Sequence, residues 1–143
     1  MNVLWGVVVT SLSLLAWGGQ AVAWFWPATA VRWNLAEAED DVETAFWADG
    51  RGEARWDTLT LWTMVVAGVL LIVDARSWVY FGLVGGSMYL YFGGRIIFTR
   101  VAMQRRDLRI GAQQNVRLGY IFGAVWAAMA LITIVASIAS LEG

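Results

Sequence analysis

LGYIFGAVWAAMALITIVASIASL, residues 118–141, decides the fold, because these 24 residues between Arg117 and Glu142 carry no charged side chain. At a rise of 1.5 Å per residue, about 20 helical residues cross a hydrocarbon layer about 30 Å thick. A segment of this length and composition predicts a helix that spans a membrane.

Three further uncharged segments appear when the chain is read outward from this one. Arg76 and Arg95 enclose 18 uncharged residues, Asp57 and Asp74 enclose 16, and no charge precedes Arg32. Because lipid offers no hydrogen-bond partners, spanning segments must satisfy their own backbone groups as helices. We therefore predict an all-α integral membrane protein, a single transmembrane domain over 1–143 with four spans in a bundle. The predicted spans are about 3–25, 58–75, 77–99 and 117–140.

Composition supports this class and excludes several kinds of chemistry. The chain is 59% hydrophobic and only 15% charged, whereas a soluble domain carries about 25% charged residues. It has no Cys and no His, and all ten basic residues are Arg. Disulfides, thiol nucleophiles, imidazole acid–base chemistry and lysine Schiff bases are therefore excluded. We predict no catalytic residues, no metal ligands and no required cofactor, and the net charge of −1 argues against nucleic acid as a partner.

The first predicted span contains one possible processing signal. Ala21-Val22-Ala23 follows an apolar run, as a signal-peptidase site would, but no basic residue precedes that run. We expect residues 3–25 to remain as the first span.

The distribution of arginine predicts the orientation. Of the nine Arg outside the spans, eight fall in the connections 28–57 and 100–117, which four spans place on the same side. Positive charge marks the cytoplasmic side of a membrane. We therefore predict a multi-pass protein of the inner (cytoplasmic) membrane with both termini outside.

The two cytoplasmic connections carry opposite charges. Three Arg against eight Asp and Glu give residues 32–57 a net charge of −5, and five Arg against one Asp give residues 100–117 a net charge of +4. The pattern predicts that an acidic face docks on a basic segment, within one chain or between chains; the alternative is a solvated acidic face without a partner. The acidic docking face is Glu37, Asp40 and Asp41, and the basic segment is Arg105, Arg106 and Arg109.

The acidic connection also predicts a short amphipathic helix along the cytoplasmic surface. Asn34 followed by Glu37 three residues later is typical of a capping box at a helix start. Apolar residues then recur at helical spacing, and Asp49-Gly50-Arg51-Gly52 is typical of a turn that ends the helix.

Arg95 and Arg100 complete the set of candidate binding residues. Arg95 lies 19 residues after Arg76, about 28 Å along a helix, which puts it near the inner interface if Arg76 is at the outer one. We interpret Arg95 as an interfacial anchor, and the alternative is that it binds a lipid headgroup or a substrate. Together with Arg100 and the basic segment, it forms the predicted partner-binding or headgroup-binding set.

Small residues recur along the third and fourth predicted spans at intervals that let helices approach closely in lipid. Packing between these two spans is the leading interpretation, and a contact face for other subunits is the alternative. The residues are Gly82, Gly86, Gly93, Gly119 and Gly123.

Ten Trp make this chain unusually rich in tryptophan. Most lie near the predicted span ends, as an aromatic belt at the membrane interface does. A deeper group is predicted to pack internally, with a bound lipid, quinone or pigment as the alternative. That deeper group is Trp17, Tyr89, Tyr91, Phe92 and Trp126.

Two segments resemble helices three and four of the MAPEG family: residues 89–98 (YLYFGGRIIF) and residues 119–123 (GYIFG). The resemblance implies a four-helix trimer with both termini outside and, in some members, conjugation of glutathione at the cytoplasmic side. The chain departs from the family where helix two opens, since residues 55–59 (RWDTL) replace its Arg, Asn and Glu signature.

These observations lead to one functional prediction with two alternatives. The first is a non-catalytic structural or accessory subunit of a larger membrane assembly, with membrane lipids and other subunits, or copies of itself, as partners. The second is a MAPEG-like trimeric enzyme that binds a glutathione-type anionic thiol through Arg95, Arg100 and Arg109. The third is a small homo-oligomeric channel or carrier.

Overall fold

The computed structural model describes residues 2–142, and every regular element in this range is helical. A single pair of residues, Val42 and Ile110, forms an isolated antiparallel bridge between two connections. The elements are α1 (Asn2–Phe25), α2 (Pro27–Arg32), the 3-10 turn η1 (Glu39–Asp41), α3 (Thr44–Thr60), α4 (Trp62–Ile72), α5 (Trp78–Gln104) and α6 (Gln113–Glu142).

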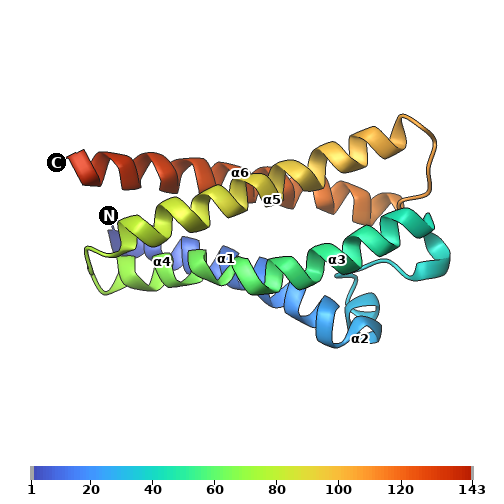
Figure 1. The fold of residues 1–143 in the computed structure, drawn as a ribbon, viewed down its shortest axis with the longest axis horizontal. Coiled ribbons are helices and arrows are strands. Elements are labelled where there is room, and N and C mark those ends of the chain that lie inside the picture. Colours follow the sequence, from blue (N-terminus) through green and yellow to red (C-terminus); the bar gives the residue numbers. More distant parts are fainter. Residues whose placement is uncertain (1, 143) are drawn as a thin grey trace.

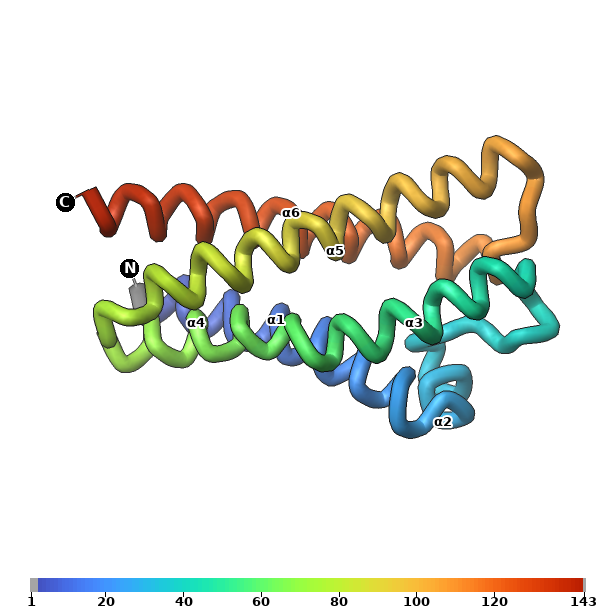
Figure 2. Tube along the Cα trace, viewed as in Figure 1, coloured from blue at the N-terminus to red at the C-terminus, as the bar shows by residue number. Residues whose placement is uncertain are grey.

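The helices form four roughly parallel columns, with α3 and α4 together making one of them (Figure 1). Both chain ends and the α4–α5 turn lie at one end of the bundle, and the connections that hold most of the charges lie at the other (Figure 2). Around the bundle, α1 packs on α3 and α4, α4 packs on α5, and α5 packs on α6. α1 and α6 meet at few positions, so this side is the least closed.

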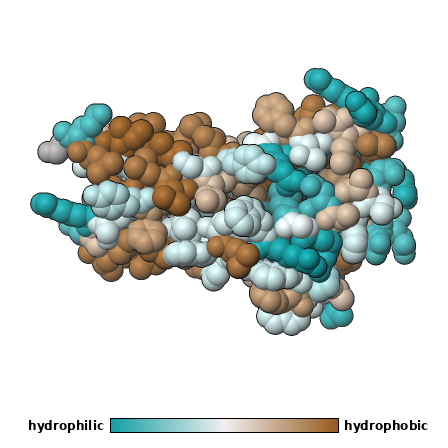
Figure 3. Space-filling model, in the orientation of Figure 1, coloured by the Kyte–Doolittle hydropathy of each residue, from teal (hydrophilic) through white to brown (hydrophobic). Residues whose placement is uncertain are grey.

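Three helical stretches are long and apolar enough to cross a membrane, which fits the predicted membrane helical bundle. On the face drawn in Figure 3, hydrophobic residues gather over the half that holds the chain ends, and hydrophilic residues gather over the half with the connections. The three stretches are Val3–Phe25, Thr44–Ile72 and Gln113–Glu142.

The second column differs from the predicted span 58–75, because helical structure begins at Thr44. The expected amphipathic helix from Asn34 is not formed: Asn34 has a φ of 55°, in the left-handed region, and residues 49–52 lie inside α3 instead of ending a helix. A tertiary contact offsets the low helix propensity of the two glycines there. Arg51 donates hydrogen bonds to the carbonyl oxygens of Ala23 and Trp24 and so caps the last turn of α1.

A local break at Leu61 separates α3 from α4. Threonine hydroxyls surround it and bond to nearby backbone: Thr58 donates to the Ala54 carbonyl at 2.7 Å, and Thr63 donates to the Thr60 carbonyl at 2.9 Å. Such side-chain bonds compete with the regular ladder and bend helices. The two helices nevertheless continue in nearly the same direction (Figure 1).

The α5–α6 seam contains most of the glycines that the sequence singles out. A Cβ added at Gly86 would lie 2.6 Å from Cγ1 of Ile134, and one added at Gly93 would lie 3.0 Å from the Ala127 nitrogen. Gly82 and Gly123 lie in the same seam. Their missing side chains let the two backbones approach, and α5 and α6 are the most extensively packed pair of helices.

Two glycines outside that set form a second close crossing. A Cβ at Gly6 would lie 2.8 Å from the Gly68 carbonyl oxygen, so the backbones of α1 and α4 approach closely at this point. Sequence reasoning missed this pair because neither glycine has a second glycine or alanine at the short helical spacing that marks a seam. The buried core lies between the seams: Val9, Ala16, Leu61, Met64, Ala67, Tyr89, Phe92, Met129 and Ala130.

Candidate functional site

A row of three carboxylates on α3 faces α5 at the charged end of the bundle. Asp49, Glu53 and Asp57 are spaced four residues apart, so they share one face of the helix. Arg95 of α5 pairs with the first two: its Nη2 lies 2.6 Å from Oδ2 of Asp49, and its Nη1 lies 2.5 Å from Oε1 of Glu53. The predicted interfacial anchor therefore joins two helices, with its guanidinium already occupied by carboxylates.

Asp57, the third carboxylate, has a different environment. It is only 7% exposed, and its Oδ2 is fully buried without a hydrogen-bond partner among the described residues. It makes no ion pair within residues 2–142, since Arg95 is held by the other two acids. Sequence reasoning placed Asp57 at the edge of a span and did not select it as a site residue.

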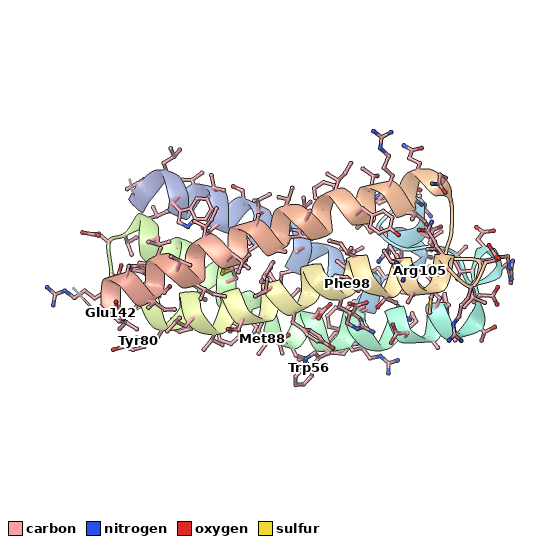
Figure 4. The ribbon with its side chains drawn as sticks, turned by 90° about the horizontal axis from the view of Figure 1, so that it is seen from above. Trp56, Tyr80, Met88, Phe98, Arg105 and Glu142 are labelled. Carbon is pink, nitrogen blue, oxygen red and sulfur yellow. The ribbon has the colours of Figure 1, made fainter. Side chains whose placement is uncertain are left out.

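A lateral pocket of about 210 Å³ opens beside Asp57 between α3 and α5. Both of its aromatic residues are largely exposed, Trp56 at 63% and Tyr91 at 70%. In Figure 4, Trp56 projects from the outer edge of α3, and Met88 lies on α5. The pocket is lined by Trp56, Asp57, Thr60, Leu61, Ser87, Met88 and Tyr91.

Arg100 lies one turn beyond Arg95 and packs in a different way. Its guanidinium lies over the Phe46 ring, 5.6 Å from the centroid, and donates to the Ile96 carbonyl at 3.1 Å. It also contacts Gly119, where an added Cβ would lie 2.8 Å from Nε, and this Nε has no hydrogen-bond partner in the described part of the chain. Gly119 thus lies against a side chain of α5.

The two charged connections meet within the chain through Arg109 and the segment before α3. The Glu43 nitrogen donates to the Arg109 carbonyl at 2.8 Å, and Nη1 of Arg109 donates to the Asp40 carbonyl at 3.1 Å. Glu37 accepts a hydrogen bond from Nδ2 of Asn115 at 2.7 Å. Besides Glu37, the acidic connection contributes backbone groups and Glu43, whose Oε1 lies 3.6 Å from Nε of Arg109. The carboxylates of Asp40 and Asp41 are exposed.

Arg105 and Arg106, the other members of the basic segment, are exposed and make no ion pair among residues 2–142. Arg105 lies at the charged end of the bundle in Figure 4. Sequence reasoning gave all three arginines the same role because it could not locate the turn at 105–107. Only Arg109 follows that turn and lies against the acidic connection.

Three of the deeper aromatic residues donate hydrogen bonds to the backbone of neighbouring helices. Nε1 of Trp17 donates to the Thr58 carbonyl at 2.8 Å, and the Tyr89 hydroxyl donates to the Ser13 carbonyl at 2.9 Å. Nε1 of Trp126 donates to the Leu12 carbonyl at 3.0 Å. Each bond connects two helices, which is the packing role that the sequence favours. For Tyr91, a member of the same predicted group, the prediction is wrong, because its side chain is 70% exposed.

A groove of about 220 Å³ lies on the open side of the bundle, between α1 and α6. Its walls are mainly aliphatic and aromatic, and amide side chains lie toward the charged end. A Cβ at Gly19, on its α1 wall, would meet no atom within 4 Å. The lining residues are Leu15, Ala16, Gly19, Gln20, Asn34, Leu35, Phe92, Ile96, Asn115, Leu118, Gly119, Phe122 and Trp126.

Comparisons with protein-family models, with curated proteins and with solved structures find no match for this chain. The resemblance to MAPEG helices therefore stays a hypothesis from sequence, and the functional argument depends on the geometry above.

Proposed function

We propose that this chain is a four-span protein of the inner membrane that serves as a non-catalytic accessory subunit of a larger membrane assembly. Three of the four spans are the long apolar stretches in α1, α3–α4 and α6. The fourth is α5, which packs against both α4 and α6 and is uncharged from Trp78 to Gly94. Arginine in the connections supports an orientation with both termini outside.

The α1–α6 groove carries the proposal of an accessory role. Gly19 lines the α1 wall of the groove, and an added Cβ there would meet no atom within 4 Å. Glycine in a helix interior costs about 0.5–1 kcal/mol relative to alanine, and Gly19 allows no close internal contact in return. In lipid, small residues are typical of surfaces where another helix approaches. We assign the groove to a transmembrane helix of a partner subunit.

Purification from native membranes at native expression level, in a mild detergent, tests this role. We expect the chain to co-purify in fixed ratio with a larger membrane protein. Gly19→Leu fills the groove and should abolish co-purification while the chain remains folded. Gly94→Leu is the matched control, since Gly94 is also a helical glycine with no atom within 4 Å of an added Cβ, and it lies outside the groove.

Two results would contradict the accessory role. One is recovery of the wild-type chain alone, as a monomer or a closed ring of copies. The other is co-purification that Gly19→Leu leaves unchanged. Orientation is tested separately with a reporter fused to the C-terminus, which we expect to be active only outside the cytoplasm.

A further inference from the structure

The pocket beside Asp57 is a second feature, independent of the proposed partner groove. An ionised carboxylate buried without a partner is costly, because an apolar environment does not replace the water it has lost. Arg95, the nearest cation on α5, is held by Asp49 and Glu53 at 2.6 and 2.5 Å. Among the described residues, the Asp57 carboxylate therefore has no ion pair and its Oδ2 has no hydrogen-bond donor, so a cation from outside the chain would stabilise its ionised form.

The other polar groups of the pocket also favour a positive ligand. Thr60 donates its hydroxyl hydrogen to the Trp56 carbonyl at 2.9 Å, and Ser87 donates to the Leu83 carbonyl at 2.8 Å. Their oxygens are thus left as acceptors, as is the carboxylate that lines the same pocket. The remaining walls are the aromatic rings of Trp56 and Tyr91 and the thioether of Met88. Aromatic faces attract cations, above all the weakly hydrated organic ones.

The depth of Asp57 further defines the ligand. It lies 17 residues before Asp74, about 25 Å along α3–α4 from the α4–α5 turn. With that turn at one boundary of a hydrocarbon layer about 30 Å thick, Asp57 lies just inside the opposite boundary. A ligand entering sideways there has its charged group near the interface and its apolar body in lipid.

We propose that this pocket binds an organic ammonium ion with an apolar body, its nitrogen against the Asp57 carboxylate and its substituents against Trp56 and Tyr91. This inference depends on the bundle being in a membrane and not on a partner subunit. The ammonium group belongs either to a phospholipid headgroup or to a free lipophilic amine, and both share the chemistry described.

Calorimetric titration with benzyltriethylammonium tests the site, using the full chain in dodecylmaltoside, a detergent with neither amine nor charge. We expect saturable binding, weakened at least about ten-fold in Asp57→Asn because the ion pair between the ammonium and the carboxylate is lost. Trp56→Leu should weaken it by about three-fold to five-fold through loss of the aromatic face. Asp74→Asn, an acid at the opposite end of the same column, and the anion benzenesulfonate are the controls.

A second titration, with phosphatidylethanolamine added to the micelles, distinguishes the two sources. Displacement of the probe assigns the site to a lipid headgroup, and unchanged binding assigns it to a free amine; both outcomes support the ammonium site. Absence of saturable binding, equal binding by Asp57→Asn, or equal binding of benzenesulfonate would overturn it. A change in oligomer size in Asp57→Asn would also overturn it, because Asp57 would then face a partner helix.

Discussion

The Tyr89 hydroxyl of α5 donates a hydrogen bond to the Ser13 carbonyl of α1, 2.9 Å away, and both residues are completely buried. The bond joins the first helix to the third column across 76 positions of sequence. The adjacent carbonyl, Leu12, accepts from Trp126 of α6. One turn of α1 therefore holds both of the columns that follow the α4–α5 turn.

Tyr89→Phe is expected to lower the free energy of unfolding by about 1 kcal/mol, the usual net value of one hydrogen bond. The loss of stability is limited to this value because the Ser13 carbonyl still accepts a backbone hydrogen bond within α1. Thermal unfolding in detergent measures the change. Tyr91→Phe is the control, since that side chain is exposed, and equal losses in the two variants would refute the role of the bond.

Arg95→Ala is expected to cost about 1 kcal/mol of stability, a modest value because the ion pairs with Asp49 and Glu53 are partly solvated. The loss should shrink as salt concentration rises, since salt screens exposed charges. Denaturation at low and high ionic strength measures both effects. Arg105→Ala should change stability by less than about 0.5 kcal/mol, because its side chain is exposed. A larger loss in Arg105→Ala than in Arg95→Ala would contradict the observed pairing.

Two glycine substitutions should have opposite signs. Gly111 has a φ of 103°, and a Cβ there would collide with the Glu37 side chain, so Gly111→Ala should destabilise by about 1–3 kcal/mol. Gly52 lies in α3 with open space around it, so Gly52→Ala should stabilise by about 0.5–1 kcal/mol. Melting temperatures of the two variants, measured in parallel, give the comparison. A gain in Gly111→Ala would show that the connections do not dock as described.

Gly86→Leu is expected to disrupt the fold instead of changing the number of copies. An added Cβ at this position would already lie 2.6 Å from Cγ1 of Ile134 and 3.3 Å from the Ala130 carbonyl oxygen. We expect a loss of about 2 kcal/mol or more, since overpacked seams force backbone shifts. Unfolding together with size measurement in detergent separates the outcomes. A stable variant of altered oligomeric size would place Gly86 between subunits.

The helical class and the approximate positions of the helices could be predicted from the sequence, because charged residues are rare inside membrane spans and therefore mark where the spans end. The start of α3 could not be predicted from the sequence. Asp49, Glu53 and the glycines between them are typical of a solvated turn, and only the tertiary contacts with Arg95 and Arg51 show why this segment is helical. A signal was present in the four-residue spacing of Asp49, Glu53 and Asp57, which is helical.

The candidate sites were less predictable. The sequence singles out Arg95, but its partner Asp49 lies 46 residues away in sequence, and only the fold of the bundle brings the two side chains together. Asp57 was overlooked because a carboxylate at the end of a span normally faces water. In the structure it is 7% exposed, and burial of this kind depends on tertiary packing that the spacing of charges does not reveal.

The cap that Arg51 provides at the end of α1 has a consequence for how the chain is made. Synthesis proceeds from the N-terminus, so Arg51, which donates to the last turn of α1, leaves the ribosome before any residue of α5 does. The first half can therefore assemble in the nascent chain with Trp17 already bonded to Thr58. Tyr89 and Trp126 emerge later, and each finds its acceptor on a helix that is already in place.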